Sequence, residues 1–414
     1  MVLAAGKGER LKPFTETRPK PLIPILDRPL ISYPLELLKR INVSHSIIVV
    51  SYMKDLLIDR VKAICNELDM SCEFVEQGKE LGTAHAVERA LEKASGEDLI
   101  VVYGDIYVDP DAVAHSLVRA VERREPFIMC VRVDDVSRYG AVRLQGSIAV
   151  SIEEKPPSKA PGVAYAGVML IPKDLHGLVS EIKASPRGEY ELTDLVSMAY
   201  RCGRGFRAIE VGDEVWHDVG YPWSIIEVHK KLLSKIDKKV VRGSVDQHVV
   251  IKGPVIVEEG AEVRGFTYIM GPAYIGRDVV VGPSAFVRPY SVIMHGSHIG
   301  FSVEIKESVV MEHAHAAHLT YIGDSVVGEN VNLGAGTLLA NLRFDEKNVK
   351  VTIKGKRIDS GRRKLGALIG GFVKTGVNVS IVPGVKIGSY AIIYPGVTVY
   401  RDVPSRAVVK DTYR

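Results

Sequence analysis

Aliphatic or small residues recur at every sixth position through most of the second half of the chain. This period fits neither an α-helix, which repeats every 3.6 residues, nor an exposed strand, which alternates every two. It fits a parallel β-helix, in which three six-residue segments complete one triangular coil and each inward side chain stacks on its counterpart one coil away. The repeating positions are Ile251, Val257, Val263, Ile269, Ile275, Val281, Val287, Ile293, Ile299, Ile305, Met311 and Ala317.

Two interruptions divide this repeat. We expect the register to slip near Tyr321, and a polar stretch over residues 341–364 to form an insertion. Both interruptions are predicted to project loops from the coil, and such loops commonly carry function. The period resumes after the slip and again after the insertion, at Val327, Leu333, Leu339, Ile369, Thr375, Ile381, Ile387, Ile393 and Val399.

The first half follows a different pattern, in which short apolar runs alternate with amphipathic segments. The pattern predicts strands at 47–51, 72–77 and 99–103 and helices at 54–68, 83–94 and 224–236. Strands that alternate with helices are typical of an α/β domain with a parallel sheet. We therefore predict four parts: an α/β domain (1–225), a helical linker (226–244), a parallel β-helix (245–403) and a short C-terminal tail (404–414).

Composition excludes several classes of protein. The 414 residues are 46% hydrophobic and 25% charged, which is typical of a globular chain, and a net charge of +4 lacks the strongly basic character of a non-specific nucleic-acid binder. No apolar run approaches the ~20 residues of a membrane span. The four cysteines form no CxxC pair, which favours reduced structural thiols and a cytoplasmic protein. Only three glutamines occur, which hints at a heat-adapted source.

A glycine-rich turn lies at the start of the chain. Gly6, Gly8 and Arg10 follow a short apolar run, and Lys20 follows within the sequence Pro-Lys-Pro. Glycines let backbone N–H groups approach phosphate oxygens, and the two cations can neutralise phosphate charge. The turn matches neither the dinucleotide fingerprint nor the Walker loop. The alternative interpretation is an ordinary turn beside solvated cations.

Two aspartates suggest a magnesium site. Asp105 ends a buried strand, where open α/β sheets place their ligands, and Asp218 lies far along the chain in Trp-His-Asp. Carboxylates in such positions can hold Mg²⁺ against a nucleotide phosphate, although a lone strand-end aspartate can equally cap a helix.

Further polar clusters could bind a base and a sugar. Gly82, which leads with Thr83 into a helix, would let a base lie against the backbone while Gln77 reads its edge. Glu154, Lys155 and Gly167 could grip a sugar phosphate, but a surface Glu–Lys pair is usually solvated.

The β-helix half contains a histidine cluster with three open interpretations. His313, His315 and His318 fall within six residues, and His295 and His298 precede them. They could bind zinc across an oligomer interface, one of them could act as a general base, or they could be solvated corner residues.

The first 225 residues resemble the sugar-1-phosphate nucleotidylyltransferases, which have a Rossmann-like α/β fold. The resemblance rests on the ordered motifs Gly-x-Gly-x-Arg, Pro-Lys-Pro, Gln-x3-Leu-Gly-Thr-Ala, Gly-Asp, Arg-Tyr-Gly, Glu-Lys-Pro, an isolated Gly and Trp-x-Asp. It implies in-line attack by a sugar-1-phosphate oxygen on the α-phosphorus of an NTP, with release of pyrophosphate and no general base. The implied roles are nucleotide binding by Gly6, Gly8, Gln77, Gly82 and Thr83, catalysis by Arg10 and Lys20, Mg²⁺ binding by Asp105 and Asp218, and sugar binding by Gly140, Glu154, Lys155 and Gly167.

The second half resembles the acetyltransferase part of the bacterial bifunctional N-acetylglucosamine-1-phosphate uridylyltransferases, and the whole chain resembles these enzymes and their archaeal relatives. The matching features include His318-Leu-Thr-Tyr321-x-Gly-Asp and Asn332-Leu-Gly-Ala-Gly-Thr. The resemblance implies a left-handed β-helix, a homotrimer, acetyl-CoA as co-substrate and His318 as the base that deprotonates the substrate amine. Asn341 would orient the amine or the oxyanion, and the implied sugar-phosphate site is Arg288, Lys306, Tyr321 and Lys347, with Asn332 nearby.

Two departures concern the acetyl-CoA contacts. Gly371 stands where the bacterial enzymes have a serine in the CoA region, and the 341–364 insertion is longer and more basic. The insertion could contact the 3′-phosphate of CoA or form a solvated hairpin.

The sequence thus predicts a bifunctional enzyme of nucleotide-sugar synthesis. One half would transfer a nucleotidyl group from UTP or dTTP to N-acetylglucosamine 1-phosphate or glucose 1-phosphate, with Mg²⁺. The other would acetylate glucosamine 1-phosphate or an epimer. Alternatives are a nucleotidylyltransferase whose β-helix only oligomerises or regulates it, a regulatory subunit with an inactive pocket, and a zinc enzyme in the β-helix.

Overall fold

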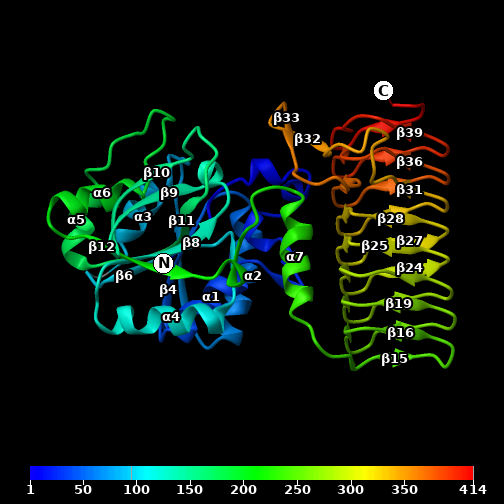
Figure 1. The fold of residues 1–414 in the computed structure, drawn as a ribbon, viewed down its shortest axis with the longest axis horizontal. Helices are drawn as coiled ribbons and strands as arrows, with labels where there is room; N and C mark the ends of the chain where they lie inside the picture. Colours follow the sequence, from blue (N-terminus) through cyan, green and yellow to red (C-terminus); the bar gives the residue numbers. More distant parts are fainter. Residues whose placement is uncertain (95, 414) are drawn as a thin grey trace. The chain divides into compact units, whose positions relative to one another are not determined.

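The computed structural model describes residues 1–94 and 96–413, which form two compact units. The first unit contains residues 1–7, 19–22 and 29–218, and the second contains residues 8–18, 23–28 and 219–414. Figure 1 shows the helices and strands of both units.

A nine-stranded sheet forms the centre of the first unit. Its strand order is β5 (Ser71–Glu76), β4 (His45–Val50), β1 (Val2–Leu3), β6 (Leu99–Tyr103), β11 (Gly162–Ile171), β8 (Phe127–Val133), β12 (Phe206–Val211), β10 (Ile148–Glu154) and β9 (Gly140–Gln145). The first four strands in this order run parallel, as predicted. The other half is mixed: β11 pairs antiparallel with both β6 and β8, and β10 pairs antiparallel with β9. The expectation of a parallel sheet is therefore wrong for this half, because a tight hairpin such as β9–β10 forces antiparallel pairing.

Three predicted helices are present in the structure. Two lie in the first unit, α2 (Lys54–Glu67) and α3 (Thr83–Leu91), and one in the second unit, α7 (Ser224–Ser234). They lie close to the predicted ranges 54–68, 83–94 and 224–236. Two short strands, β7 (Ile106–Val108) and β13 (Trp216–Asp218), pair antiparallel beside the main sheet. The helices are α1 (Ser32–Arg40), α2 (Lys54–Glu67), α3 (Thr83–Leu91), α4 (Pro110–Glu122), α5 (His176–Val179), α6 (Asp194–Arg201) and, in the second unit, α7 (Ser224–Ser234).

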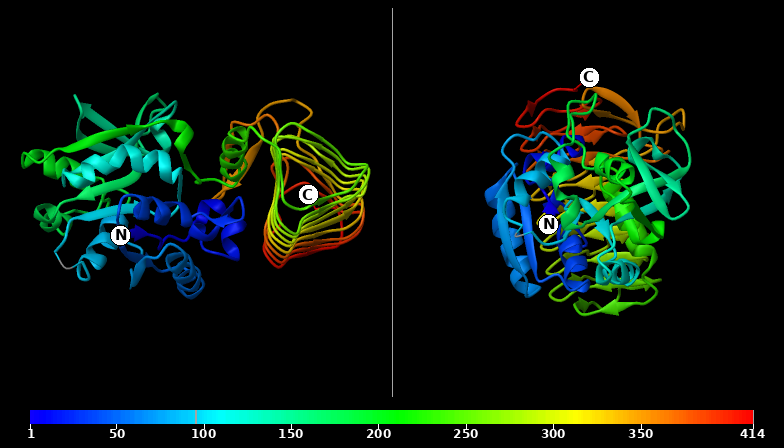
Figure 2. Two further views of the ribbon diagram at one scale, coloured as in Figure 1. Left: turned by 90° about the horizontal axis from the view of Figure 1, so that it is seen from below. Right: turned by 90° about the vertical axis from the view of Figure 1, so that its left-hand side faces the viewer.

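The second unit is the left-handed parallel β-helix that the resemblance implies. Figure 2 shows its coils stacked end-on, with three flat sides. Inward aliphatic side chains such as Val257, Ile275 and Ile293 form one continuous buried core. The first side consists of β14 (Val240–Val241), β17 (Val255–Val257), β20 (Ala273–Ile275), β23 (Ser291–Ile293), β26 (Val309–Val310), β29 (Val326–Val327), β34 (Leu368–Ile369) and β37 (Lys386–Ile387).

The other two sides are equally regular, and their strands extend from Ser244 to Val409. The second side consists of β15 (Ser244–Val245), β18 (Glu262–Val263), β21 (Val280–Val281), β24 (His298–Phe301), β27 (His315–His318), β30 (Asn332–Leu333), β35 (Lys374–Thr375), β38 (Ile392–Ile393) and β40 (Val408–Val409). The third side consists of β16 (Val250–Lys252), β19 (Tyr268–Met270), β22 (Phe286–Val287), β25 (Glu304–Lys306), β28 (Tyr321–Gly323), β31 (Leu338–Leu339), β36 (Ser380–Ile381) and β39 (Thr398–Val399).

The register of the repeat slips earlier than predicted. Val310 and Ala316 occupy the inward positions that the sequence assigned to Met311 and Ala317. The reason is a corner that is one residue shorter: Val257 pairs with Ile275, 18 residues on, whereas Ile293 pairs with Val310, 17 residues on. The same shortening recurs between β28 and β29, one coil further along.

The polar insertion folds into a small hairpin beside the coils. Its strands β32 (Lys350–Ile353) and β33 (Lys356–Asp359) pair antiparallel (Figure 1). Val349 and Val351 are buried, whereas the basic residues at the tip are exposed. The insertion is therefore a packed hairpin with a solvated basic tip.

The two segments from the start of the chain that belong to the second unit carry short helical turns and a strand. They include η1 (Glu9–Leu11), η2 (Phe14–Glu16) and β2 (Pro24–Ile25). Asp27, in the second of these segments, accepts a hydrogen bond from Tyr274 of β20 (3.0 Å) and one from the backbone N–H of His295 (2.9 Å).

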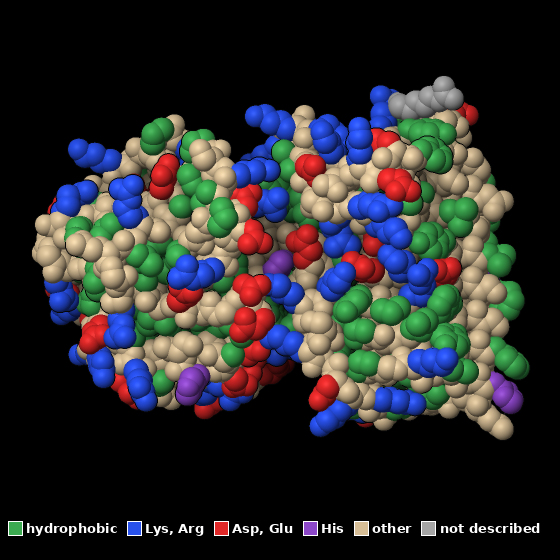
Figure 3. Space-filling model, viewed as in Figure 1, with side chains coloured by type: hydrophobic (Ala, Val, Ile, Leu, Met, Phe, Trp, Pro, Cys, Tyr) green, Lys and Arg blue, Asp and Glu red, His purple; other side chains and the backbone are tan. Residues whose placement is uncertain are grey.

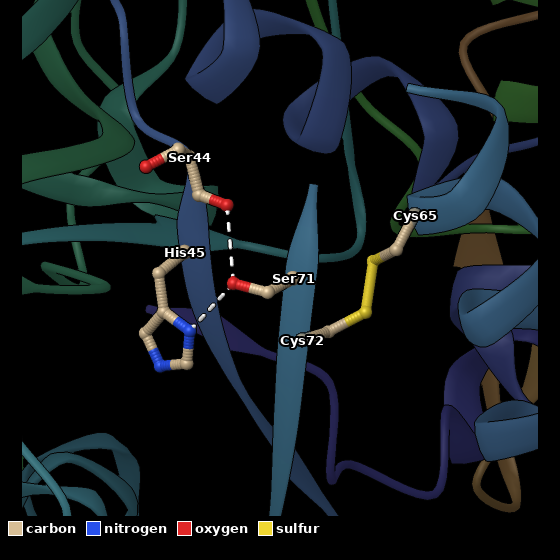
Figure 4. The surroundings of a disulfide bond; sticks show 5 residues. All are labelled: Ser44, His45, Cys65, Ser71 and Cys72. Atoms are coloured by element: carbon tan, nitrogen blue, oxygen red, sulfur yellow. Dashed lines mark hydrogen bonds between the residues drawn. A yellow bond between two sulfur atoms is a disulfide. The ribbon is translucent and has the colours of Figure 1, made fainter. Parts of the chain in front are cut away.

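A disulfide corrects the expectation of reduced cysteines. Cys65 at the end of α2 is bonded to Cys72 in β5 (Figure 4), whereas Cys130 and Cys202 are free. The absence of a CxxC pair gave no warning, because a helix followed by a parallel strand brings these two positions together across a tight turn.

Among the described residues, no helix has the length and apolar character needed to cross a membrane.

Candidate active sites

Two predicted metal ligands and a predicted catalytic lysine meet in the first unit. The Nζ atom of Lys20 lies 2.7 Å from Oδ2 of Asp105 and 3.8 Å from Oδ1 of Asp218. Lys20 is buried. The two carboxylates are more than a hundred residues apart in the sequence, and these distances show that they share one cation. This is the arrangement that the two aspartates need in order to share a metal ion.

Local structure explains how the two aspartates meet. Asp105 lies in the tight turn between β6 and β7, and Asp218 ends β13, where it pairs with Ile106 of β7. Gly104 is required in this turn, because a Cβ atom there would lie 3.0 Å from the carbonyl oxygen of Leu3 on the neighbouring strand. The antiparallel β7–β13 pair thus fixes both carboxylates at the carboxyl end of β6.

The donor set of this carboxylate pair suits magnesium. Mg²⁺ usually takes one or two protein carboxylates and completes its shell with water and substrate phosphates. Asp105 and Asp218 provide that number. No cluster of three or more His, Cys, Asp or Glu side chains able to hold a metal occurs in the described part of the chain, which includes the histidines of the β-helix.

The predicted base-binding residues form a second group. The amide nitrogen of Gln77, a buried side chain, donates to the carbonyl of Gly82 (2.9 Å). Gly82 has a φ of +121°, and a Cβ atom there would collide with the backbone of Tyr190. Thr83 accepts a hydrogen bond from the backbone N–H of Leu192 (2.9 Å). The loop is thus fixed on both sides, and the NH2 group of Gln77 is already hydrogen-bonded within the loop.

Tyr103 links the groups and was given no role by the sequence patterns. Its hydroxyl hydrogen-bonds with Thr83, and its ring packs edge-on against Tyr165 at 5.6 Å between centroids. A Cβ atom on Gly167 would come within 3.3 Å of the Tyr103 side chain, which explains the glycine. Burial, together with the negative charge of Glu154, raises the pKa of Tyr103 well above its ordinary value. The phenol is therefore a neutral hydrogen-bonding group.

A further polar group surrounds the predicted sugar-binding residues. Glu154 accepts a hydrogen bond from Thr193 (3.3 Å) and lies 3.9 Å from Arg187, which also pairs with the buried Glu191. A Cβ atom on Gly140 would lie 3.1 Å from Oε1 of Glu154. Burial raises the pKa of Glu191 despite its arginine partner.

Sequence reasoning missed Arg187, Glu191 and Thr193. Glu191 and Thr193 lie in the run Glu-Tyr-Glu-Leu-Thr-Asp, in which no motif marks a site, and Arg187 precedes this run. Lys155, by contrast, contributes its backbone N–H to the carbonyl of Tyr139 (2.8 Å) and holds a left-handed conformation.

The glycine-rich turn is divided between the two units. Gly6 belongs to the first unit, whereas Gly8 and Arg10 belong to the second. Gly8 has a φ of 63° and begins η1, and its carbonyl accepts from Leu11 N–H (2.8 Å) and from the Thr15 hydroxyl (3.0 Å). The Arg10 guanidinium lies 5.4 Å from the ring centroid of Tyr221.

In the β-helix, three predicted residues converge on an aspartate that the sequence did not single out. Asp324, whose side chain is 2% exposed, accepts from Lys306 Nζ (2.7 Å) and Asn341 Nδ2 (2.5 Å). The same amide nitrogen donates to the Tyr321 hydroxyl (3.1 Å). Burial raises the pKa of Tyr321, with a further contribution from Asp324. The carboxylate thus orients a cation, an amide and, through the amide, a phenol.

The insertion takes part in this network. Arg362 pairs with Glu307 (2.7 Å) and lies 3.6 Å from Asp324, and Lys230 of α7 also pairs with Glu307 (3.1 Å). Burial alone would raise the pKa of Glu307, but Arg362 and Lys230 outweigh it and lower that pKa. Glu307 and Asp324 occupy the two shortened corners of the coil, so the register slip is what brings their side chains into this cluster.

The remaining predicted residues lie on or next to neighbouring strands, except Lys347. Arg288 pairs with Glu304 (2.8 Å), and Glu304 is the strand partner of Tyr321. His318 ends β27 with an exposed side chain, and Asn332 on β30 is the strand partner of His315. Lys347 lies in the exposed loop that leads into the hairpin.

Comparisons with known proteins agree with both halves. Residues 1–235 match the nucleotidyl transferase family, and residues 269–361 match the GMPPB C-terminal domain family. A bifunctional sugar-1-phosphate nucleotidylyltransferase/acetyltransferase of Sulfurisphaera tokodaii is 43% identical over 405 residues, 97% of each chain. The bifunctional protein GlmU of Methanocaldococcus jannaschii is 39% identical over 413 residues, 99% of this chain and 96% of that protein.

A bacterial protein of the same name, from Paraburkholderia phymatum, is 28% identical over 465 residues, 99% of this chain and 95% of that protein. The archaeal similarity spans both units, so it covers the carboxylate pair at Lys20 as well as the Asp324 network. The chain therefore belongs to the family of bifunctional sugar-1-phosphate nucleotidylyltransferases/acetyltransferases.

Proposed function

We propose that the first unit transfers a nucleotidyl group from UTP or dTTP to a sugar 1-phosphate, N-acetylglucosamine 1-phosphate or glucose 1-phosphate. The observation that carries this proposal is the meeting of Lys20, Asp105 and Asp218 at the carboxyl end of β6. Asp105 and Asp218 would hold Mg²⁺, which would supply charge neutralisation to the triphosphate.

The residues of the chain then position the reactants. A sugar-1-phosphate oxygen is already an anion, so its attack on the α-phosphorus needs no base, and the α–β phosphoanhydride bond breaks to release pyrophosphate. Lys20 neutralises charge at the reacting phosphate, and Arg10 does so from the glycine-rich turn. Gln77, with Gly82 and Thr83, holds the base.

Contacts in the same unit support a separate sugar site. Glu154 is already oriented by Thr193 and Arg187, so its carboxylate can accept sugar hydroxyls without reorganisation. Gly140 and Gly167 leave space beside Glu154 and Tyr103, respectively.

We propose that the β-helix N-acetylates glucosamine 1-phosphate or an epimer with acetyl-CoA. His318 accepts a proton from the substrate ammonium, and the neutral amine attacks the thioester carbonyl carbon. The carbon–sulfur bond breaks, and the CoA thiolate takes up a proton. Asn341 orients the amine or the oxyanion, and Lys306, Arg288, Tyr321 and Lys347 bind the sugar phosphate, with Asn332 nearby.

The Asp324 network supports this assignment. A buried carboxylate that fixes Lys306 and Asn341 pre-organises a cation and an amide for a phosphorylated amino sugar. Acetylation would come first, and its product would be the sugar 1-phosphate that the other unit activates.

A homotrimer in the cytoplasm completes the proposal. Large apolar side chains are exposed along the β-helix, where Figure 3 shows apolar patches on its surface. Such patches are typical of association surfaces. The exposed large apolar residues of the β-helix include Phe266, Phe301, Leu319, Leu338, Phe344, Ile392 and Val408.

A substrate panel with two matched variants tests both activities. Hexose, hexosamine and N-acetylhexosamine 1-phosphates are combined with each NTP, with and without acetyl-CoA, and pyrophosphate and CoA release are measured. We expect Asp105→Ala to abolish only pyrophosphate release and His318→Ala to abolish only CoA release. Unchanged CoA release in His318→Ala would reject the acetyltransferase mechanism, and a stoichiometric transition metal in the purified protein would favour a zinc site instead.

A further inference from the structure

A largely buried arginine, Arg18, links residues 8–18 of the second unit to the β-helix; its side chain is 15% exposed. Arg18 lies between two glutamates from adjacent coils, with its guanidinium nitrogen 2.5 Å from Glu312 and 3.2 Å from Glu329. The Glu329 side chain is 5% exposed. One guanidinium thus serves two carboxylates, and without it two anions would face each other in a poorly solvated place.

A second attachment lies a few residues earlier in the segment. The backbone N–H of Ser389 donates to Glu16 Oε2 (2.8 Å), and the Ser389 hydroxyl donates to the carbonyl of Pro13 (3.2 Å). Phe14 and Thr15, between these contacts, are fully buried. The segment from Pro13 to Arg18 is therefore held at both of its ends by residues of the β-helix.

Two consecutive glycines of the β-helix make room for these attachments. A Cβ atom on Gly371 would collide with the Glu329 carboxylate, and one on Gly370 would lie 2.9 Å from Pro13 Cβ. Gly371 thus leaves the Glu329 carboxylate room to face Arg18.

The attached segment leads directly back to the glycine-rich turn. The Thr15 hydroxyl and the Leu11 N–H both donate to the carbonyl of Gly8, so the turn is tied to the part of the segment that the β-helix holds. Arg10 lies between Gly8 and Leu11, within the turn that their hydrogen bond closes. Movement of Arg18 away from its glutamates would therefore loosen the backbone that carries Arg10.

We propose that Arg18, Glu329 and Ser389 are positioning residues for nucleotidyl transfer, through which the β-helix sets the conformation of the glycine-rich turn. The inference rests on the proposed function of Arg10 at the NTP phosphates. It gives the β-helix a role in the first reaction that is independent of acetyl transfer. The residues touch no substrate and act through Gly8 and Arg10.

The test uses the full chain with Glu329→Gln, Arg18→Lys and Arg18→Gln, and Glu258→Gln as the control. Glu258 also lies on the β-helix and pairs with an arginine, Arg242 (2.8 Å), which lies outside residues 8–18. Pyrophosphate release gives kcat and KM for the NTP, and CoA release from the same preparation reports an intact β-helix.

We expect Glu329→Gln to lower kcat/KM for the NTP about tenfold to a hundredfold, as small misplacements of a catalytic group do, while CoA release stays unchanged. Arg18→Lys should retain more activity than Arg18→Gln, and the control should match the wild type. Hydrogen exchange provides a readout besides activity: amides of residues 8–18 should exchange faster in Glu329→Gln.

The outcomes separate this inference from the proposed function. A wild-type enzyme that releases no pyrophosphate with any NTP rejects the proposed function. An active wild type with unchanged kcat/KM in Glu329→Gln and Arg18→Gln rejects the positioning role. Equal losses of pyrophosphate and CoA release would also reject it, because they would indicate a general loss of folding.

Discussion

Replacement of Asp324 by asparagine tests the Asp324 network, because it keeps the shape of the side chain and removes its charge. The carboxylate serves Lys306 at 2.7 Å and Asn341 at 2.5 Å, and its side chain is 2% exposed. Both groups donate to the same oxygen, Oδ2. In Asp324→Asn one oxygen becomes an NH2 group, so a donor must face either this pair or Arg362, which lies 3.6 Å from Oδ1. In either orientation, Lys306 and Asn341 lose their anionic acceptor.

The expected loss follows from this geometry. Breaking a buried ion pair by removing one partner costs about 3–5 kcal/mol, and a hydrogen bond to a charged group contributes about 1.5–3 kcal/mol. Arg362 keeps Glu307 as a partner, so the cluster does not lose all of its ion pairs. We therefore expect the misplacement of Asn341 and Lys306 to cost about 2–3 kcal/mol of transition-state stabilisation, within the range for a hydrogen bond to a charged group. At about 1.4 kcal/mol per tenfold change, kcat/KM for acetyl transfer should fall roughly 30- to 150-fold.

The assay follows CoA release with a thiol reagent at varied glucosamine 1-phosphate and saturating acetyl-CoA. Asp246→Asn serves as the control, since Asp246 is an exposed β-helix aspartate that accepts one backbone hydrogen bond, from Gly265 (3.0 Å). Pyrophosphate release should stay at the wild-type rate in both variants. Acetyl transfer within threefold of wild type in a folded Asp324→Asn protein would refute the reasoning.

Three further predictions concern other parts of the chain. Lys20→Met should lower nucleotidyl transfer by about a hundredfold or more without changing CoA release, because it removes the cation shared by the two aspartates. Glu307→Gln should destabilise the β-helix at pH 7 in urea unfolding. Because the folded state lowers the pKa of Glu307, the stability that this carboxylate contributes is present above its unfolded pKa. The difference from wild type should therefore shrink as the pH falls through the folded pKa, below about 4.5. Cys72→Ser should lower stability by about 2–3 kcal/mol, and the denatured wild type should expose two thiols without reductant and four with it.

Each of these predictions has an outcome that contradicts it. Normal pyrophosphate release in Lys20→Met would remove the lysine from the reacting phosphate. A Glu307→Gln deficit that stays constant from pH 7 down to about pH 2 would exclude a charge effect. Four titratable thiols in the denatured, unreduced wild type would show that Cys65 and Cys72 are not bonded.

Much of the fold could be predicted, because the periodic spacing of buried apolar residues is a local property of the sequence. The bounds of α2 and β6 follow from apolar spacing, and the six-residue repeat indicated the β-helix. The same reasoning failed at Met311 and Ala317, since a corner that loses one residue leaves the local pattern almost unchanged. It also missed the antiparallel half of the sheet and the Cys65–Cys72 bond, which depend on how strands pair.

The candidate sites divide in the same way. Residues marked by glycines, strand ends or family motifs were found, among them Asp105 and Asn341. Asp324 and Tyr103 lay inside quoted motifs without a role, and Arg187 and Glu191 had no signal. Their importance comes from partners that only folding supplies.

By itself, therefore, the sequence determined the classes of the two units and the chemistry of their motifs, because spacing and residue type are local properties that survive in an extended chain. Only the tertiary structure decided which charges share an environment. Lys20 meets Asp105 across 85 positions and Arg18 meets Glu312 across 294. Such pairs depend on strand register and on the closure of long loops, which no short window of sequence encodes.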